Sequence, residues 1–243
     1  MAKPPAAVAK DDADVPEVAQ KSDAWTDLGL TLPIFIAYHL GVVFLPVRNA
    51  ADLVTTELRG LAKHSLPMYA TLTLALGALF VIVLWSLGQK KSLAPSRFLF
   101  IALEGTLYAV LMRAASSYVV GSLRLAGASG DGAFSSVVMA LGAGFYEEIA
   151  FRVGVFGVGA LVLRQLFGKG GKGVAVTIGW ALCESAAFSG WHYVGAMGES
   201  FELQSFLFRA VCGLFLTMIF AFRGFAPAVW THAIYDLWVM LGG

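Results

Sequence analysis

The sequence predicts an all-α protein, a polytopic transmembrane helical bundle with seven or eight spans. Of its 243 residues, 58% are hydrophobic and only 14% are charged, and the mean hydropathy is +0.74. Soluble domains usually carry about a quarter charged residues. The apolar excess is therefore too large for a soluble core, and it is concentrated in long runs. Because open sheet edges are not tolerated in lipid, we expect these runs to be helices.

Residues 1–24 differ in composition from everything that follows. They are rich in Ala, Pro, Lys and Asp and have no apolar period, which predicts a disordered tail. The tail lacks the pattern of a signal peptide, because acids dilute its basic residues and the first long apolar run begins only near Leu28.

The apolar runs then follow in order: 27–46, 67–88, 98–120, 133–166, 173–192, 203–222 and 225–241. The fourth is too long for one span, since about 34 residues of helix measure about 50 Å against a hydrocarbon core of about 30 Å. It must bend, protrude or split, with Gly142 and Gly144 as candidate break points. The count is therefore seven spans, or eight if this run splits.

The chain divides into the tail, N-terminal membrane helices over 25–130 and a membrane core over 131–243. Between the first two spans, Leu53, Leu58 and Leu61 have a partly helical spacing with charges between them. This segment is either an interfacial helix or a polar loop. With seven spans and the N-terminus inside, ten Lys and Arg residues fall on the inner side and four on the outer side. The bias predicts a cytoplasmic N-terminus.

Charge and cysteine content exclude some functions. The net charge of +1 leaves no basic footprint for nucleic acid. Cys183 and Cys212 both lie in apolar stretches, so we expect small core residues and no disulfide framework.

Ionisable residues inside the spans carry the functional information. Inserting each of them near the bilayer centre costs about 2.5–3.5 kcal/mol of free energy. A cluster of them therefore indicates that the residues pair with one another or take part in chemistry. The C-terminal half contains Glu147, Glu148, Arg152, Glu184, His192, Arg209, His232 and Asp236.

Glu148 and Arg152 are four residues apart, in the order that favours an ion pair on one helix face. Glu147 is rotated about 100° away on a helix of 3.6 residues per turn, so it is left to take a proton. His232 and Asp236 are also four residues apart, and the aspartate is expected to orient the imidazole.

Simpler interpretations exist for each group alone. A buried Glu–Arg pair can simply hold two helices together, and a single histidine can be a core residue whose hydrogen bonds are all made. Glu184, Arg209, Glu104 and Arg113 are interpreted as pairing, snorkelling or span-end charges. The combination of E-E-x-x-x-R, F-x-x-x-H and H-x-x-x-D on separate helices favours a functional site.

These motifs resemble those of the CPBP intramembrane proteases, the CAAX protease and bacteriocin-processing (Abi) family. The resemblance covers about residues 133–241, with the motifs in the family's order. Its four motifs are matched by Glu147, Glu148 and Arg152; by Phe188 and His192; by Gly213 on a looser third helix; and by His232 and Asp236.

The resemblance implies that 131–243 is a catalytic core with a polar cavity, which cleaves peptide bonds near the membrane surface. Substrates in the family are prenylated CAAX proteins, bacteriocin or signalling peptides, and C-terminal sorting tails. The CAAX-processing branch has Asn where this chain has Asp236, which can donate a hydrogen bond only when protonated. Asp236 is therefore expected to orient His232, with His232 as the donor. A bacterial inner membrane is the expected location.

For peptide hydrolysis we expect Glu147 to be the general base that deprotonates water. His192 would help to hold that water, and His232 would face the oxyanion. Glu148 with Arg152 would hold the motif helix, and Phe188 would shape the cavity wall. No cofactor is expected. A zinc-dependent alternative would use Glu147, His192 and His232 as ligands, although no HExxH motif is present.

Three rival functions remain open. An immunity or peptide-binding protein of the same fold would sequester a peptide without cleaving it. A transporter would use the acids as proton relays, and a scaffold would use them as paired charges. The expected partners of a protease are membrane lipid and a membrane-associated protein or peptide. The sequence does not specify substrate identity, hydrolysis versus acyl transfer, or oligomeric state.

Overall fold

The computed structural model describes residues 23–45, 49–63, 65–87, 93–121, 132–195 and 198–242. Throughout these ranges the regular elements are helices, which confirms the predicted all-α class. The order is α1 (Ala24–Phe44), α2 (Leu53–Leu61), α3 (Leu66–Leu87), α4 (Pro95–Val120), α5 (Gly132–Gly142), η2 (Ala143–Gly157), α6 (Val158–Phe167), α7 (Gly171–Trp191), α8 (Leu203–Phe222) and α9 (Phe225–Gly242).

The ends of α1 and α2 follow from local capping. The predicted tail lies outside the described residues except for its last two, of which Asp23 caps α1 by accepting from the backbone N–H groups of Trp25 and Thr26. Asp52 caps α2 in the same way, with Oδ1 2.8 Å from the backbone nitrogen of Thr55. The segment between the first two spans is therefore a helix and not a polar loop, and its interfacial position stays a prediction.

Five helical segments are long and apolar enough to cross a membrane: Ala24–Phe44, Leu66–Ser86, Pro95–Val120, Gly132–Phe167 and Leu203–Phe222. The predicted count of seven or eight is therefore not confirmed. The predicted spans 173–192 and 225–241 do form helices, α7 and α9. Both contain polar motif residues, among them Glu184, His232 and Asp236, and these lower the hydropathy of their helices.

The long fourth run stays helical from Gly132 to Phe167. Its backbone changes from α to π at Ala143 and returns to α at Val158. The expected break at Gly142 and Gly144 is therefore a change of helix type. Both glycines also allow close packing: a Cβ on Gly144 would lie 2.6 Å from the Cβ of Ala233, and one on Gly142 would overlap the ring of Tyr38.

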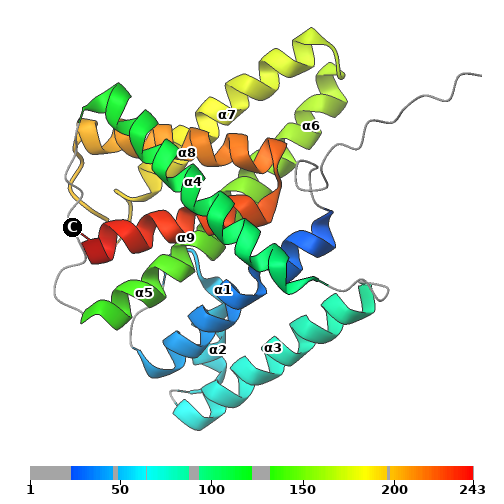
Figure 1. The fold of residues 1–243 in the computed structure, drawn as a ribbon, viewed down its shortest axis with the longest axis vertical. Coiled ribbons are helices and arrows are strands. Elements are labelled where there is room, and N and C mark those ends of the chain that lie inside the picture. Colours follow the sequence, from blue (N-terminus) through cyan, green and yellow to red (C-terminus); the bar gives the residue numbers. More distant parts are fainter. Residues whose placement is uncertain are drawn as a thin grey trace, which may run out of the picture.

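Helix α9 lies at the centre of the bundle (Figure 1) and packs against α1, α4, α5, η2 and α8. Helices α6 and α7 pack against each other and project from one end, while α3 lies at the periphery against α1 and α2. The N-terminal helix α1 contacts α5, η2 and α9. The predicted catalytic core is therefore packed directly against the N-terminal half.

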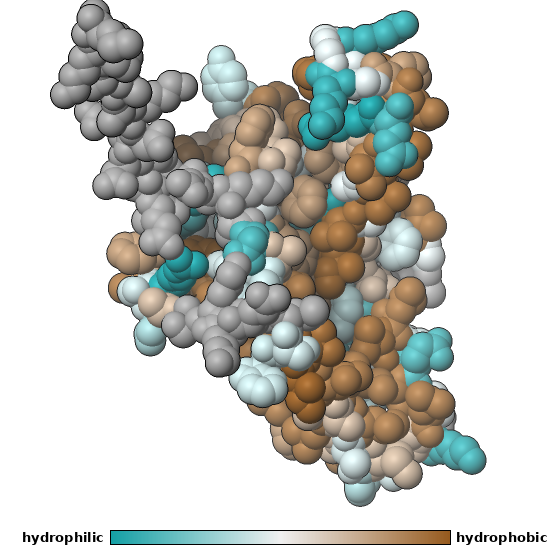
Figure 2. Space-filling view, turned by 90° about the vertical axis from the view of Figure 1, so that its right-hand side faces the viewer, coloured by the Kyte–Doolittle hydropathy of each residue, from teal (hydrophilic) through white to brown (hydrophobic). Residues whose placement is uncertain are grey.

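Large apolar side chains cover much of the molecular surface. Examples from four helices are Leu74, Leu103, Leu161 and Ile178, each more than half exposed. Figure 2 shows hydrophobic residues along a broad strip of one face, with hydrophilic groups gathered toward its upper and lower ends. Such a surface suits lipid and not water. Cys212 is buried as expected, whereas Cys183 is exposed, so the core prediction was wrong for Cys183; both are free thiols.

Candidate active site

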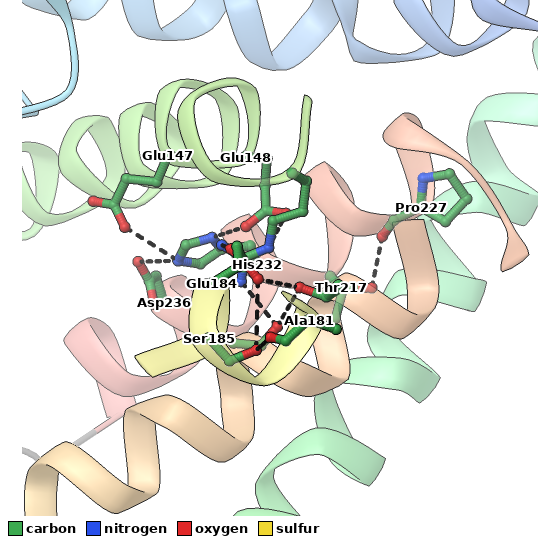
Figure 3. A network of polar contacts seen from close by, with 12 residues as sticks. Glu147, Glu148, Ala181, Glu184, Ser185, Thr217, Pro227, His232 and Asp236 are labelled. Carbon is green, nitrogen blue, oxygen red and sulfur yellow. Dashed lines mark hydrogen bonds and ion pairs between the residues drawn. The ribbon is translucent and has the colours of Figure 1, made fainter. Parts of the chain in front are cut away.

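Three helices bring the predicted motif residues together. Glu147, Glu148 and Arg152 come from η2, Phe188 from α7, and His232 from α9, and all of them are buried. His192 is the C-cap residue of α7. Figure 3 shows the carboxylates of η2 pointing at His232, with Asp236 beside it.

Arg152 lies at the charge centre of the site and is fully buried. Its Nε is 3.2 Å from Oε2 of Glu148, the contact expected from their spacing. Its Nη1 is 3.5 Å from Oε1 of Glu184, and its Nη2 donates to the carbonyl oxygen of Gly213 at 3.2 Å. One guanidinium thus serves two buried carboxylates from two helices and a carbonyl from a third.

Glu184 is the second carboxylate of this cluster. Its Oε2 accepts a 2.6 Å hydrogen bond from the hydroxyl of Thr217, which also lies 3.0 Å from the carbonyl oxygen of Gly213. The interpretation of Glu184 as a pairing residue therefore matches its contacts. Gly213, the residue assigned to the third motif, is where α8 approaches α7, because a Cβ there would lie 2.9 Å from Cδ1 of Phe188.

His232 contacts three carboxylates, more than the spacing predicted. Nδ1 is 2.8 Å from Oε1 of Glu148, whereas Asp236 lies on the other nitrogen, with Oδ2 3.5 Å from Nε2. The expected contacts of Asp236 with His232 and of Glu148 with Arg152 are both present, and the bond from Glu148 to the ring is an additional contact that the spacing did not predict. The orienting role of Asp236 stays a prediction. Glu148 faces His232 from the opposing helix and bridges it to Arg152.

Glu147 has one partnered and one unpartnered oxygen. Oε1 accepts a 2.7 Å hydrogen bond from Nδ2 of Asn49. Oε2 is buried without a hydrogen-bond partner among the described residues and lies 4.0 Å from Nε2 of His232. The sequence predicted an unpaired acid and missed Asn49, which is 98 positions away in a short connecting segment with no motif.

Phe188 packs between the charged groups of the site. Its ring centroid lies 4.2 Å from Cζ of Arg152 and 5.9 Å from the ring of His232. The ring of His192 lies 5.3 Å from it. The face of the ring stabilises the guanidinium by a cation–π contact, and the wall-forming role stays a prediction.

His192 has a defined orientation. Its Nδ1 lies 3.0 Å from the carbonyl oxygen of Phe188, which only a protonated Nδ1 satisfies, so Nε2 of the neutral ring is an acceptor. The ring of Phe188 contacts the rings of both His192 and His232, so the two histidines share a neighbour in the site.

The other charged residues that the sequence places in the spans discussed above, Arg209, Glu104 and Arg113, also have partners. Arg209 binds both oxygens of Glu199, at 2.8 and 2.7 Å. Arg223 binds both oxygens of Glu104, at 2.7 and 3.2 Å. Arg113 lies over the ring of Trp238, 5.0 Å from its centroid. The contacts of Arg209 and Glu104 match the pairing interpretation, and Arg113 makes a cation–π contact.

The zinc alternative gains no support from the described residues. Within the described ranges, no three His, Cys, Asp or Glu side chains come together in a way that would hold a metal ion. Glu147, His192 and His232 are therefore not arranged as a ligand set in this structure, and the absence of a cofactor stays a prediction.

Residues 130–238 match the family model of Rce1-like type II CAAX prenyl endopeptidases. This segment is a CPBP-family domain. It runs from just before α5 into α9 and contains every motif residue named above. The Rce1-like domain supports an intramembrane endopeptidase in general, and Asn49 lies outside it. No curated protein and no solved structure matches the chain.

Proposed function

We propose that this protein is an intramembrane endopeptidase in which Glu147 activates water to cleave a membrane-associated protein or peptide. The observation that carries the proposal is the state of the Glu147 carboxylate. One oxygen is held by Asn49, while the other is buried, unpartnered among the described residues and too far from His232 for a direct hydrogen bond, at 4.0 Å. A polar contact of this length is suited to an intervening water molecule.

Glu147 removes a proton from that water as the hydroxide attacks the carbonyl carbon of the scissile peptide. The same carboxyl group then passes the proton to the leaving amine, so one residue serves as base and then as acid. His192, whose Nε2 is an acceptor, takes the second hydrogen bond of the water and fixes its orientation.

His232 stabilises the oxyanion that forms on the former carbonyl oxygen. Its Nδ1 donates to Glu148, so a donor at Nε2 requires the imidazolium form. The carboxylates of Glu148 and Asp236 on either side of the ring stabilise that cation. Arg152 holds Glu148 in turn, so the ring is positioned before substrate binds.

The substrate is proposed to be held at the membrane. The surrounding surface is apolar, which suits a lipidated CAAX-type tail, a bacteriocin or signal peptide, or a C-terminal sorting tail. Asp236 in place of the asparagine of the CAAX-processing branch makes a CAAX substrate the less favoured of these. The protein is also proposed to lie in a bacterial inner membrane, with its N-terminus in the cytoplasm.

The proposal is tested by comparing membrane proteomes of cells that carry the wild-type protein or Glu147→Gln, with protein termini identified by mass spectrometry. At least one membrane protein should keep an unprocessed terminus in the variant and be processed in the wild type. An immunity or peptide-binding protein would instead keep its phenotype with both Glu147→Gln and His232→Ala, and no terminus would change.

The metal-independent chemistry has a test of its own. Protein purified without metal and incubated with strong chelators should keep its cleavage rate. Loss of activity that returns on addition of zinc would overturn the glutamate mechanism in favour of the zinc alternative.

A further inference from the structure

The contact between Asn49 and Glu147 joins the catalytic domain to the N-terminal half. Nδ2 of Asn49 donates to Oε1 of Glu147 at 2.7 Å, and both side chains are buried. We propose that Asn49 is a positioning residue for the reaction, which fixes the Glu147 carboxylate so that its other oxygen faces the water. The inference rests on the proposed function and extends the site beyond residues 130–238.

The turn before α2 places Asn49. Oδ1 of Asn49 accepts from the backbone nitrogen of Ala51 at 2.8 Å, and the backbone nitrogen of Asp52 donates to the carbonyl oxygen of Asn49 at 3.1 Å. Because Oδ1 is committed to its own turn, Nδ2 must point outward. The amide is therefore oriented by local structure before it meets Glu147.

Tyr38 of α1 fixes this turn to the bundle. Its hydroxyl donates to Oδ2 of Asp52 at 2.7 Å and accepts from the backbone nitrogen of Asn49 at 3.1 Å. Tyr38 is fully buried, and its ring makes an edge contact with Tyr146, 5.5 Å between centroids. Tyr146 directly precedes Glu147, so the donor and the carboxylate are held against the same aromatic pair.

Without Asn49 the carboxylate would gain a competing contact. Nε2 of His232 lies 4.0 Å from Oε2 of Glu147, and a modest rotation of an untethered carboxylate would bring the two into a direct ion pair. That pair would occupy the oxygen that takes the proton from water and the nitrogen that faces the oxyanion. The hydrogen bond from Asn49 keeps the two groups apart and available.

The test compares Asn49→Ala and Asn49→Asp with the wild type. Both variants remove the amide donor. Asn49→Asp keeps Oδ1 for the bond to Ala51 but places a second carboxyl group against that of Glu147, which disfavours the charged form of the base. The probe is an internally quenched peptide that spans a cleavage site found in the proteome comparison, assayed in liposomes at neutral pH. A lost hydrogen bond to a charged group corresponds to about a tenfold to hundredfold change. We expect kcat to fall by that factor with KM within about twofold.

Glu57→Gln is the matched control, because Glu57 is exposed on α2 in the same segment. It should keep both kcat and KM. Thermal unfolding of each variant gives the folded fraction at the assay temperature. Wild-type kcat in both Asn49 variants, or a fall in kcat that only follows the folded fraction, would overturn the inference.

Glu147→Gln, assayed in parallel, separates this inference from the proposed function. Near-normal cleavage by Glu147→Gln would refute the glutamate mechanism itself. Loss of cleavage by Glu147→Gln with full activity of both Asn49 variants would refute only the role of Asn49.

Discussion

Replacing Arg152 by methionine tests how the buried charges of the site are balanced. The substitution keeps an unbranched side chain beside Phe188 but removes the cation. It leaves Glu148 and Glu184, both essentially inaccessible, without their shared partner. The carbonyl oxygen of Gly213 also loses the hydrogen bond from the guanidinium.

The expected loss follows from these contacts. Removing one partner from a buried ion pair typically costs about 3–5 kcal/mol, because the other charge stays buried and uncompensated. For a domain of this size that corresponds to a decrease in Tm of about 6–20 °C. Adding Glu184→Gln to Arg152→Met removes one of the two stranded carboxylates, so the double variant should recover part of the loss through a coupling energy of about 0.5–3 kcal/mol.

The assay is thermal unfolding of the purified protein in detergent micelles, followed by circular dichroism. Arg164→Met is the control, because Arg164 lies near the end of the same continuous helical run and away from the buried site; its Tm should stay close to that of the wild type. An Arg152→Met variant as stable as Arg164→Met would refute the account of a charge-balanced centre. Strictly additive effects of Arg152→Met and Glu184→Gln on the free energy of unfolding would also refute it.

Two further predictions concern the packing of η2 and the orientation of the motif histidine on α9. Gly144→Ala should lower the free energy of unfolding by about 1–3 kcal/mol and also lower the cleavage rate, because the new Cβ would lie 2.6 Å from that of Ala233 and push η2 away from α9. The control is Gly77→Ala, because a Cβ at Gly77 meets open space. Equal unfolding temperatures of the two variants would contradict the prediction. Glu148→Gln should reduce kcat more than Asp236→Asn, since Glu148 makes the 2.8 Å bond to the ring and Asp236 lies 3.5 Å from it. A larger loss of kcat in Asp236→Asn than in Glu148→Gln would contradict this prediction and assign the orienting role to Asp236.

Local spacing accounts for what the sequence predicted of the site. Glu148 and Arg152 are one turn apart, and that proximity survives the change from α to π helix. The spacing of His232 and Asp236 likewise predicts their contact. Such pairs depend on a single helix, so no knowledge of the tertiary fold is needed.

Contacts between helices could not be predicted in this way. The bond between Glu148 and His232 depends on how η2 and α9 are rotated against each other, which the close approach at Gly144 sets. Asn49 reaches Glu147 only because Tyr38 anchors the turn before α2. Neither has a periodic signal, since a turn has no apolar period and helix rotation is decided by packing.

The span count was not confirmed, for a related physical reason. Helices α7 and α9 contain the polar groups of the site, and groups that pair within the bundle lower the hydropathy of the helix that carries them. The most apolar helix, α3, is conversely at the periphery and far from the chemistry.

The most direct test of the central claim is the single-turnover cleavage rate of purified Glu147→Gln in liposomes. The glutamine keeps the shape of the side chain and can still accept from Asn49, but it cannot take a proton from water. The account predicts at least a hundredfold lower rate, by the usual size of general-base catalysis, with an unchanged Tm. Cleavage within a few-fold of the wild-type rate would contradict it.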